Sequence, residues 1–287
     1  MKPKTDLTPI SYFPGCSMAT TARENNQTLI AVCDRMGMDL LELPDWNCCG
    51  SSSTHSINTG LAFQLACRNL SLAPAGRPLL AACPSCYLRL KTAHEQLKAD
   101  AAAREDYERR WKRPVDDGLD IVSFFEILAD KRRFQPEIRQ SLNGLRFAPY
   151  YGCMLSRPPI LRTTPALKNA HFGLMEKVLT RFGAEPTSWN HATKCCGTFL
   201  SAARPEVAAS LVDRIMQDAV AADAECLVTA CAMCHLNLEI RCRIPDKRPV
   251  FHFSELLAVA YGIPVRGQWF KRHLIDPMPL LRSRGIA

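Results

Sequence analysis

Short apolar runs alternate with longer segments of helical spacing along the first part of the chain. The runs at 9–13 (PISYF), 39–43 (DLLEL) and 78–83 (PLLAAC) have the length and apolar density of buried β-strands. Between them, apolar positions at 20–36 and 58–72 recur with the spacing of amphipathic helices. This part of the chain is therefore predicted to alternate strand and helix.

The same alternation returns in the second part of the chain. Strands are predicted at 146–151 (RFAPYY), 184–189 (AEPTSW) and 225–231 (ECLVTAC), and helices at 167–182 and 206–221. Strands that alternate with helices are typical of an α/β fold built on a parallel sheet. We therefore predict a small, mostly parallel sheet flanked by helices in each half.

Four landmarks occur twice in the same order, which indicates an internal duplication. The first half reads ISYFPGC, CCG, LLAACPSC and DIVSFFEILA, and the second reads FAPYYGC, CCG, LVTACAMC and PVFHFSELLA. We predict two homologous domains, 1–144 and 145–287, that join near Gly144. A helix is expected to begin at each CxxC, and Gly37 and Gly183 are expected to end the first helix of each half.

The halves differ in two segments. The first half carries a charged insertion at 98–118, predicted to be a solvated helix and loop. The tail at 269–287 has no counterpart in the first half and is either a docking segment or a loose end.

The composition is that of a globular protein, with 47% hydrophobic and 22% charged residues in 287. No apolar run approaches the roughly 18–20 residues of a membrane span, and the N-terminus lacks the apolar core of a signal peptide. We expect a cytoplasmic protein without a transmembrane segment. The net charge of +8 favours acidic partners, but no run of Lys/Arg or RNA-binding signature is present, so no nucleic acid is expected.

The 14 cysteines indicate metal binding or redox chemistry. In a reducing compartment, clustered cysteines have these roles more often than they form disulfides. Ten of them lie at the ends of predicted strands, where ligands gather in open α/β sheets. The CxxC pairs also sit at expected helix N-termini, which favour the thiolate. The candidate metal- and cofactor-binding residues are Cys16, Cys48, Cys49, Cys83 and Cys86 in one crevice, and Cys153, Cys195, Cys196, Cys231 and Cys234 in another.

Five thiolates at each site favour an iron–sulfur cluster over zinc. Structural zinc takes four ligands, and adjacent cysteines are poorly placed to share one ion. A cluster offers several irons, so neighbouring cysteines can bind different ones, and a fifth thiolate exceeds the four of an ordinary 4Fe–4S cube. Gly50 and Gly197 are expected to let the backbone approach such a bulky group. Two zinc sites, or redox disulfides of the CxxC type, are the alternatives; disulfides would leave each CCG pair unexplained.

The remaining cysteines and the polar neighbours are less informative. Core packing is expected for Cys33 and Cys67 in helices and for Cys226 in a buried strand, and Cys242 matches no repeat partner. The polar candidates for contact with substrate or cluster are His191, Lys194 and Thr198 beside the second CCG, Arg157 after Cys153, and Tyr87 and His235 after the CxxC pairs. The alternative is a solvated loop for His191 and Lys194, and a surface side chain for Arg157. For Tyr87 and His235 the alternative is helix packing.

The motifs FPGC, CCG and CPSC, followed by YGC, CCG, CAMC and PVFHFSELLAVAYG, resemble the CCG-domain family, and within it the B subunits of heterodisulfide reductases. The resemblance covers nearly the whole chain. It implies two noncubane 4Fe–4S clusters, one per five-cysteine set. It also implies two partners, an iron–sulfur protein like the C subunits and a flavoprotein like the A subunits of those reductases. The chain lacks the CxxCxxCxxxCP motif of fused members, so electrons would pass through a separate protein.

The resemblance implies an oxidoreductase that acts on sulfur groups. Two clusters that face each other can supply one electron each, which matches the two electrons of cleaving or forming a disulfide. The bacterial members act in sulfur oxidation with a lipoate-binding protein, and this branch is the expectation here. The alternative is an electron-transfer subunit of a flavin-linked dehydrogenase complex that delivers electrons to a quinone or another acceptor. A zinc-stabilised binding module without a redox role is the third hypothesis.

Overall fold

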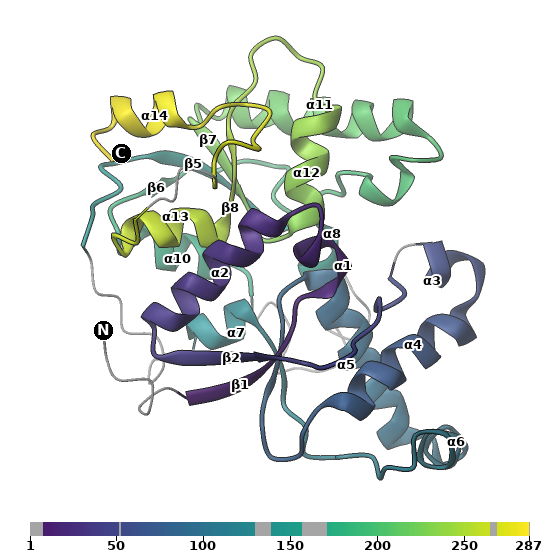
Figure 1. Cartoon of the computed structure of the whole chain (residues 1–287). Coiled ribbons are helices and arrows are strands. Elements are labelled where there is room, and N and C mark those ends of the chain that lie inside the picture. Colours follow the sequence, from purple (N-terminus) through teal and green to yellow (C-terminus); the bar gives the residue numbers. More distant parts are fainter. Residues whose placement is uncertain (1–7, 52, 130–138, 157–170, 265–268, 287) are drawn as a thin grey trace.

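Two four-stranded parallel sheets form the frame of the molecule (Figure 1), in a computed structural model that describes residues 8–51, 53–129, 139–156, 171–264 and 269–286. The strand order is β2-β1-β3-β4 in the first sheet and β6-β5-β7-β8 in the second, and every pairing is parallel. The strands are β1 Thr8–Phe13, β2 Met38–Glu42, β3 Leu79–Ala81, β4 Ile121–Ser123, β5 Arg146–Tyr150, β6 Glu185–Pro186, β7 Cys226–Thr229 and β8 Val250–His252. The predicted α/β duplication is confirmed.

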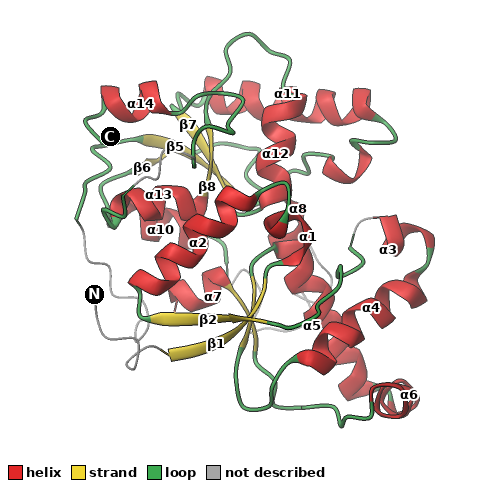
Figure 2. Ribbon diagram, in the orientation of Figure 1, coloured by secondary structure: helices red, strands yellow, loops and turns green. Residues whose placement is uncertain are grey.

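Helices flank both sheets (Figure 2), while the edge strands β2 and β6 remain largely exposed. Those of the first half are α1 Gly15–Ala19, α2 Arg23–Arg35, α3 Ser53–Ile57, α4 Thr59–Leu72, α5 Pro84–Ala99, α6 Ala101–Trp111 and α7 Phe124–Ala129. Those of the second half are α8 Gly152–Ser156, α10 Leu174–Thr180, the 3-10 helix η3 Thr198–Leu200, α11 Pro205–Ala221, α12 Ala232–Arg241, α13 Phe253–Ala260 and α14 Met278–Ser283. No described helix is both long and apolar enough to cross a bilayer.

The local sequence explains the main elements. The inner strands β3 and β7 are buried at every residue, which is why they read as continuous apolar runs rather than alternating ones. Gly37 and Gly183 follow α2 and α10 with φ of 82° and 88°, a left-handed conformation that ends helices and favours glycine. The Asn58 side chain caps α4 by accepting a hydrogen bond from Leu61 N.

Four elements differ from the sequence prediction. The landmarks DIVSFFEILA and PVFHFSELLA each contain a fourth strand, β4 or β8, before a helix, and the sequence analysis predicts neither strand. The strand predicted at 184–189 shrinks to the two residues of β6, both exposed at a sheet edge, where Pro186 has no N–H to donate. The predicted helix 167–182 begins only at Leu174, and its first positions, 167–170, lie outside the described residues.

The two halves pack together in matching pairs of helices. Helix α2 contacts α13, its neighbour in Figure 1, and α7 contacts α10, so each half lends corresponding elements to the interface. Phe253 at the start of α13 lies 6.3 Å from Phe124 and 5.1 Å from Phe125 between ring centroids. Both clusters of buried apolar residues contain members from each half, so the core is continuous across the join.

The C-terminal tail is docked on the second half. Leu281 of α14 and Ile286 are buried, and Arg284 donates a 2.5 Å hydrogen bond to Glu225 Oε1. The Asn143 side-chain amide donates to Arg284 O at 2.7 Å. The docking-segment alternative for the tail is therefore correct.

Candidate metal centres

The first five-cysteine set gathers at the carboxyl end of the first sheet. Cys16 lies in α1 directly after β1, Cys83 is the N-cap of α5, and Cys86 lies in the first turn of that helix. The CCG triplet follows β2 and completes the set. The Sγ–Sγ distance is 3.8 Å between Cys16 and Cys48 and 3.2 Å between Cys49 and Cys86.

The second set repeats this arrangement. Cys153 lies in α8 after β5, and Cys231 and Cys234 occupy the N-cap and first turn of α12. The Sγ atoms of Cys196 and Cys234 are 3.5 Å apart, and Gly197 N donates to Cys195 Sγ at 3.3 Å. None of the 14 cysteines, all within the described residues, forms a disulfide. The separations exceed the roughly 2.05 Å of an S–S bond but suit thiols that share a larger group.

The two sets adjoin each other across the interface between the halves. The thiols of Cys83 and Cys231, the N-cap residues of the two CxxC helices, are close enough to interact through a hydrogen bond. The neighbouring helices cross over in the same region, since α1 contacts α12 and α5 contacts α8. The two cysteine sets therefore lie next to each other at the interface between the halves.

The crowding of thiols makes ionisation uneven within each set. Hydrogen bonds from Cys16 and Cys49 lower the pKa of Cys48 to about 2, while the same contact with Cys48 raises the pKa of Cys49 to about 12. In the second set, the contact between Cys196 and Cys234 lowers the pKa of the first and raises that of the second. Several thiolates so close together cannot all ionise without a positive partner. The donor set thus fits a cationic metal group.

Glycines beside the thiols leave room for close packing. A Cβ on Gly15, whose φ is +73°, would lie 2.7 Å from Cys86 Sγ, and one on Gly152 would lie 3.4 Å from Cys234 Sγ. The sequence analysis does not single out these two glycines, although each directly precedes the first cysteine of its set.

Gly50 and Gly197, the glycines of the two CCG triplets, pack closely against neighbouring helices. Both have left-handed φ, +74° and +76°, and a Cβ there would meet Ala62 Cα at 3.0 Å and Ala208 Cα at 3.2 Å, respectively. Each glycine therefore allows close packing of its CCG triplet against α4 or α11.

The polar residues beside the second CCG have partners other than thiols or are exposed. His191 Nδ1 pairs with Asp218 Oδ2 at 2.9 Å, and Lys194 is exposed. Thr198 Oγ1 donates to Met233 O at 3.4 Å. Arg157 lies outside the described residues. These contacts favour the solvated-loop interpretation for His191 and Lys194.

Tyr87 and His235, at matching positions after the two CxxC pairs, also bind groups other than thiols. Tyr87 Oη donates to Glu126 Oε1 at 3.1 Å, and His235 Nδ1 lies 2.9 Å from Asn25 Nδ2. Their positions fit the packing alternative, with His235 reaching across to the other half.

Two buried asparagines hold the CCG loops, and the sequence analysis missed them. Asn69 of α4 exchanges hydrogen bonds with the Asn47 backbone, accepting from its N at 2.9 Å and donating to its O at 3.0 Å. Asn237 of α12 donates to Cys196 O at 2.8 Å. An amide on the apolar face of a helix is the signal that could have found them, because a buried amide needs such partners.

The four other cysteines lie in the core, as predicted for three of them. Cys33 is in α2, Cys67 in α4 and Cys226 at the start of β7, while Cys242 follows α12 as its C-cap. All four are buried, and burial raises the pKa of each thiol, that of Cys67 to about 12. They behave as small apolar residues.

Known proteins similar to this chain are parts of reductases. It is 25% identical over 280 residues, 94% of this chain and 98% of the other, to the 8-methylmenaquinol:fumarate reductase membrane anchor subunit of Wolinella succinogenes. It is 24% identical over 273 residues, 88% and 89% of the two chains, to the B subunit of the ferredoxin/F420H2-dependent CoB-CoM heterodisulfide reductase of Methanosarcina acetivorans. Relatives of these kinds are named as parts of oxidoreductases, which supports an iron–sulfur redox subunit.

The fold and the repeat are found in other proteins as well. A crystal structure of a hypothetical protein from Helicobacter pylori matches 91% of this chain and 50% of its own, with a TM-score of 0.68 at 15% identity, and so shares the fold. The cysteine-rich CCG domain matches residues 10–91 and again 147–239. The chain therefore belongs to the CCG cysteine-rich domain family and carries that domain twice.

Proposed function

We propose that the chain is the iron–sulfur catalytic subunit of a heterodisulfide-reductase-like complex, in which it cleaves or forms a disulfide with two electrons. The observation that carries the proposal is the junction of two five-thiol sets, with Cys83 and Cys231 interacting across the interface. A two-electron reaction at two sulfur atoms needs two neighbouring sites, and the duplication supplies both.

In this proposal each set holds one noncubane 4Fe–4S cluster, and all ten cysteines are ligands. The clusters, when bound, supply single electrons and iron positions open to a sulfur atom. The ten proposed ligands are Cys16, Cys48, Cys49, Cys83, Cys86, Cys153, Cys195, Cys196, Cys231 and Cys234.

The protein orients each set by burying one side and exposing the other. Both CxxC pairs are buried at the N-termini of α5 and α12. Cys16 is exposed, and Cys48, Cys153 and Cys195 are half-buried. A substrate or an electron-transfer partner would therefore approach each set from the side of its first cysteine and its CCG triplet.

Three partners in the cytoplasm are part of the proposal. They are an iron–sulfur protein like the C subunits of heterodisulfide reductases, a flavoprotein like their A subunits, and a lipoate-binding carrier of bacterial sulfur oxidation. The net charge of +8 suits an acidic carrier. The relative from Methanosarcina acetivorans is named as one lettered part of its heterodisulfide reductase, so that enzyme has other parts.

A second candidate function is electron transfer within a flavin-linked complex, between a dehydrogenase or reductase and a quinone or another acceptor. The similarity to the fumarate reductase anchor of Wolinella succinogenes over 94% of this chain favours it. In that case the two sets would relay electrons without binding a sulfur substrate.

Iron, sulfide and spectroscopy test the proposal. Protein purified without oxygen is expected to hold about eight irons per chain with matching acid-labile sulfide, as two 4Fe–4S clusters require. Adding a dithiol such as dihydrolipoamide should then change the EPR signal of the oxidised protein. Two zinc ions without sulfide would contradict the clusters, whereas clusters whose EPR signal ignores thiols would favour the electron-transfer alternative.

A further inference from the structure

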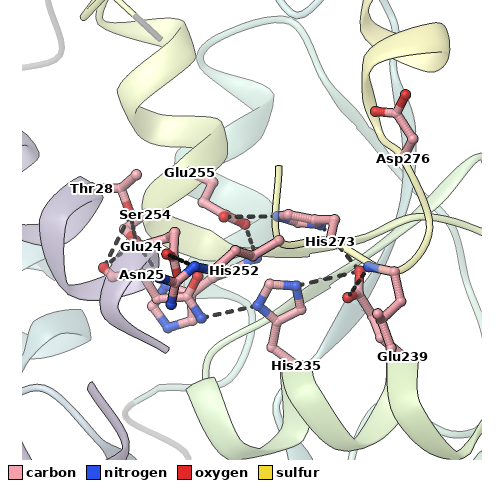
Figure 3. A network of polar contacts seen from close by, with 12 residues as sticks. Glu24, Asn25, Thr28, His235, Glu239, His252, Ser254, Glu255, His273 and Asp276 are labelled. Carbon is pink, nitrogen blue, oxygen red and sulfur yellow. Dashed lines mark hydrogen bonds and ion pairs between the residues drawn. The ribbon is translucent and has the colours of Figure 1, made fainter. Parts of the chain in front are cut away.

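A second group of metal-type donors lies apart from the cysteines, where the C-terminal segment crosses α12 and α13 (Figure 3). His235 and Glu239 project from α12, Glu255 from the first turn of α13, and His273 from the segment that precedes α14. The nearest donor atoms of His235, Glu255 and His273 all lie within 4.8 Å of one another. A pocket of about 400 Å³ borders the group.

Three of these donor atoms converge in ion-pair contacts that lack hydrogen-bond geometry (Figure 3). Glu239 Oε1 is 3.1 Å from His273 Nδ1 and 3.7 Å from His235 Nε2. Among the described residues, none of the three atoms has a hydrogen-bond partner, and all three are buried. Ligands about 2.0–2.1 Å from a tetrahedral zinc ion lie about 3.3 Å from each other, so the two separations from Glu239 Oε1 are close to those of ligands around one ion.

The surrounding contacts hold the donors in ligand orientations. Leu274 N donates to Glu239 Oε2 at 2.9 Å, which leaves Oε1 directed at the two imidazoles. His273 Nε2 donates to Glu255 Oε1 at 3.0 Å, the carboxylate–histidine arrangement that commonly supports a metal-bound imidazole. Glu255 Oε2 is itself fixed by the backbone N–H of His252 at 2.7 Å.

Asn25 of α2, in the other half of the molecule, contacts the imidazole of His235. Its side-chain amide lies 2.9 Å from His235 Nδ1. The structure places the amide nitrogen of Asn25 next to Nδ1. Metal binding at Nε2 requires the flipped amide, whose oxygen would accept the proton of Nδ1 and leave the lone pair of Nε2 for the metal.

The two carboxylates of the group also favour a cation. Glu239 and Glu255 are only 5% and 1% exposed, and buried carboxylates are normally paired or bound to metal ions.

We propose that His235, Glu239 and His273 bind one zinc ion, with the fourth position facing the pocket and Glu255 and Asn25 orienting the two imidazoles. Two histidines and a glutamate are a known ligand set for zinc with an open fourth position. The ion would join the C-terminal segment to α12 and, through Asn25, to the first half. The site uses no cysteine, although His235 directly follows Cys234, a proposed cluster ligand, in α12.

Zinc content of the cluster-loaded, full-length protein tests the site. After anaerobic incubation with ZnCl2 and removal of loose metal, the wild type is expected to retain about one zinc per chain. X-ray absorption at the zinc edge should give a shell of nitrogen and oxygen at about 2.0–2.1 Å, with no sulfur at about 2.3 Å.

Conservative variants complete the test, because they preserve the size of each side chain. His273→Gln and Glu239→Gln should lose the zinc while keeping the iron and sulfide of the wild type. Asp276→Asn, a carboxylate on the same segment whose Oδ1 accepts from Met278 N at 3.0 Å, should keep the zinc. Glu255→Gln should weaken zinc affinity by about 10–100-fold, as removal of a supporting carboxylate does.

Three outcomes would overturn the proposal: no zinc retained by the wild type, sulfur in the zinc shell, or full zinc retention in both His273→Gln and Glu239→Gln. An unfolded variant is recognised by the loss of its iron. In that event the zinc affinity of Glu255→Gln tests the proposal, because this variant can keep the capping hydrogen bond from His252 N. An affinity equal to that of the wild type would then contradict the site.

Discussion

At the scale of single residues, the backbone comes closest to the thiols at Gly15 and Gly152. Each glycine lies between a strand and the first cysteine of its set, with a left-handed φ and a thiol of the CxxC helix beside it. A side chain at Gly15 would meet two obstacles, since the left-handed conformation disfavours other residues and the Cys86 sulfur already fills the space. At Gly152 the conformation is the main obstacle, since Cys234 Sγ would lie at a contact distance of 3.4 Å. Gly15 and Gly152 are therefore part of the cysteine motifs that follow them.

Gly15→Ala should empty the first cysteine set and leave the second. Its Cβ would lie 2.7 Å from Cys86 Sγ, so that thiol must move. Iron content should fall from about eight to about four per chain, as the loss of one 4Fe–4S cluster requires.

The matched control for this prediction is Gly76→Ala. Gly76 has nearly the same φ, +71°, but no atom within 4 Å of an added Cβ. It therefore introduces the backbone strain without the collision. Equal iron loss in both variants would show that strain alone, and not contact with the thiol, causes the effect.

At the scale of elements, α14 and the tail depend on an ionic contact with the second sheet. Glu225 directly precedes β7. Its Oε1 accepts a hydrogen bond from Arg284 at 2.5 Å, and its Oε2 accepts one from Arg146 N at 2.9 Å. Burial opposes the charge on Glu225, but the hydrogen bonds from Arg284 and Arg146 prevail and lower its pKa below the ordinary 4.5. The docked tail therefore prefers Glu225 ionised.

Docking of the tail should weaken in acid. A carboxyl group with a depressed folded-state pKa adds stability above its unfolded pKa, and that stability is lost as pH falls through the folded value. Thermal unfolding measured from pH 7 down to pH 3 should show a steeper loss in the wild type than in Glu225→Gln. Parallel pH curves for the two proteins would refute the assigned role of Glu225.

The sequence predicted most elements because their residues are buried in simple patterns. The runs of β1, β3, β5 and β7 are apolar since both faces of these inner strands are covered. The length of the edge strand β6 was overestimated, because its exposed residues show little alternation of apolar and polar positions. The ten cysteines could be divided into two sets of five, because they occur in the same order in both repeats.

The His235, Glu239 and His273 group could not be predicted in the same way. Its members come from one helix and a distant segment, and neither half repeats the set. Their meeting depends on how the tail folds back over α12, which no local spacing reveals. The same holds for Asn25, whose contact with His235 joins residues 210 positions apart.

At the scale of the whole molecule, the halves share one interior. The Thr28 and Ser254 hydroxyls are 2.6 Å apart, and Phe253 packs against α7 of the other half. We propose that the repeat units, 1–144 and 145–287, are homologous domains by descent that fold as one cooperative body.

Phe253→Ala should destabilise both halves together. The side chain is 1% exposed, and its removal is expected to cost about 3–5 kcal/mol because it leaves a cavity in the core. Urea unfolding followed by hydrogen exchange should give one transition, shifted equally for amides of β1 and β5. Two transitions, with only the second half shifted, would mean that the domains unfold independently.

The meeting of Cys83 and Cys231 also has an electrical consequence. Each is the N-cap of its helix, so α5 and α12 direct the positive ends of their dipoles toward the same small region. Negative charge that arrives there is stabilised by two helices, one from each half. An electron that reaches this junction is therefore stabilised by the N-termini of one helix from each half.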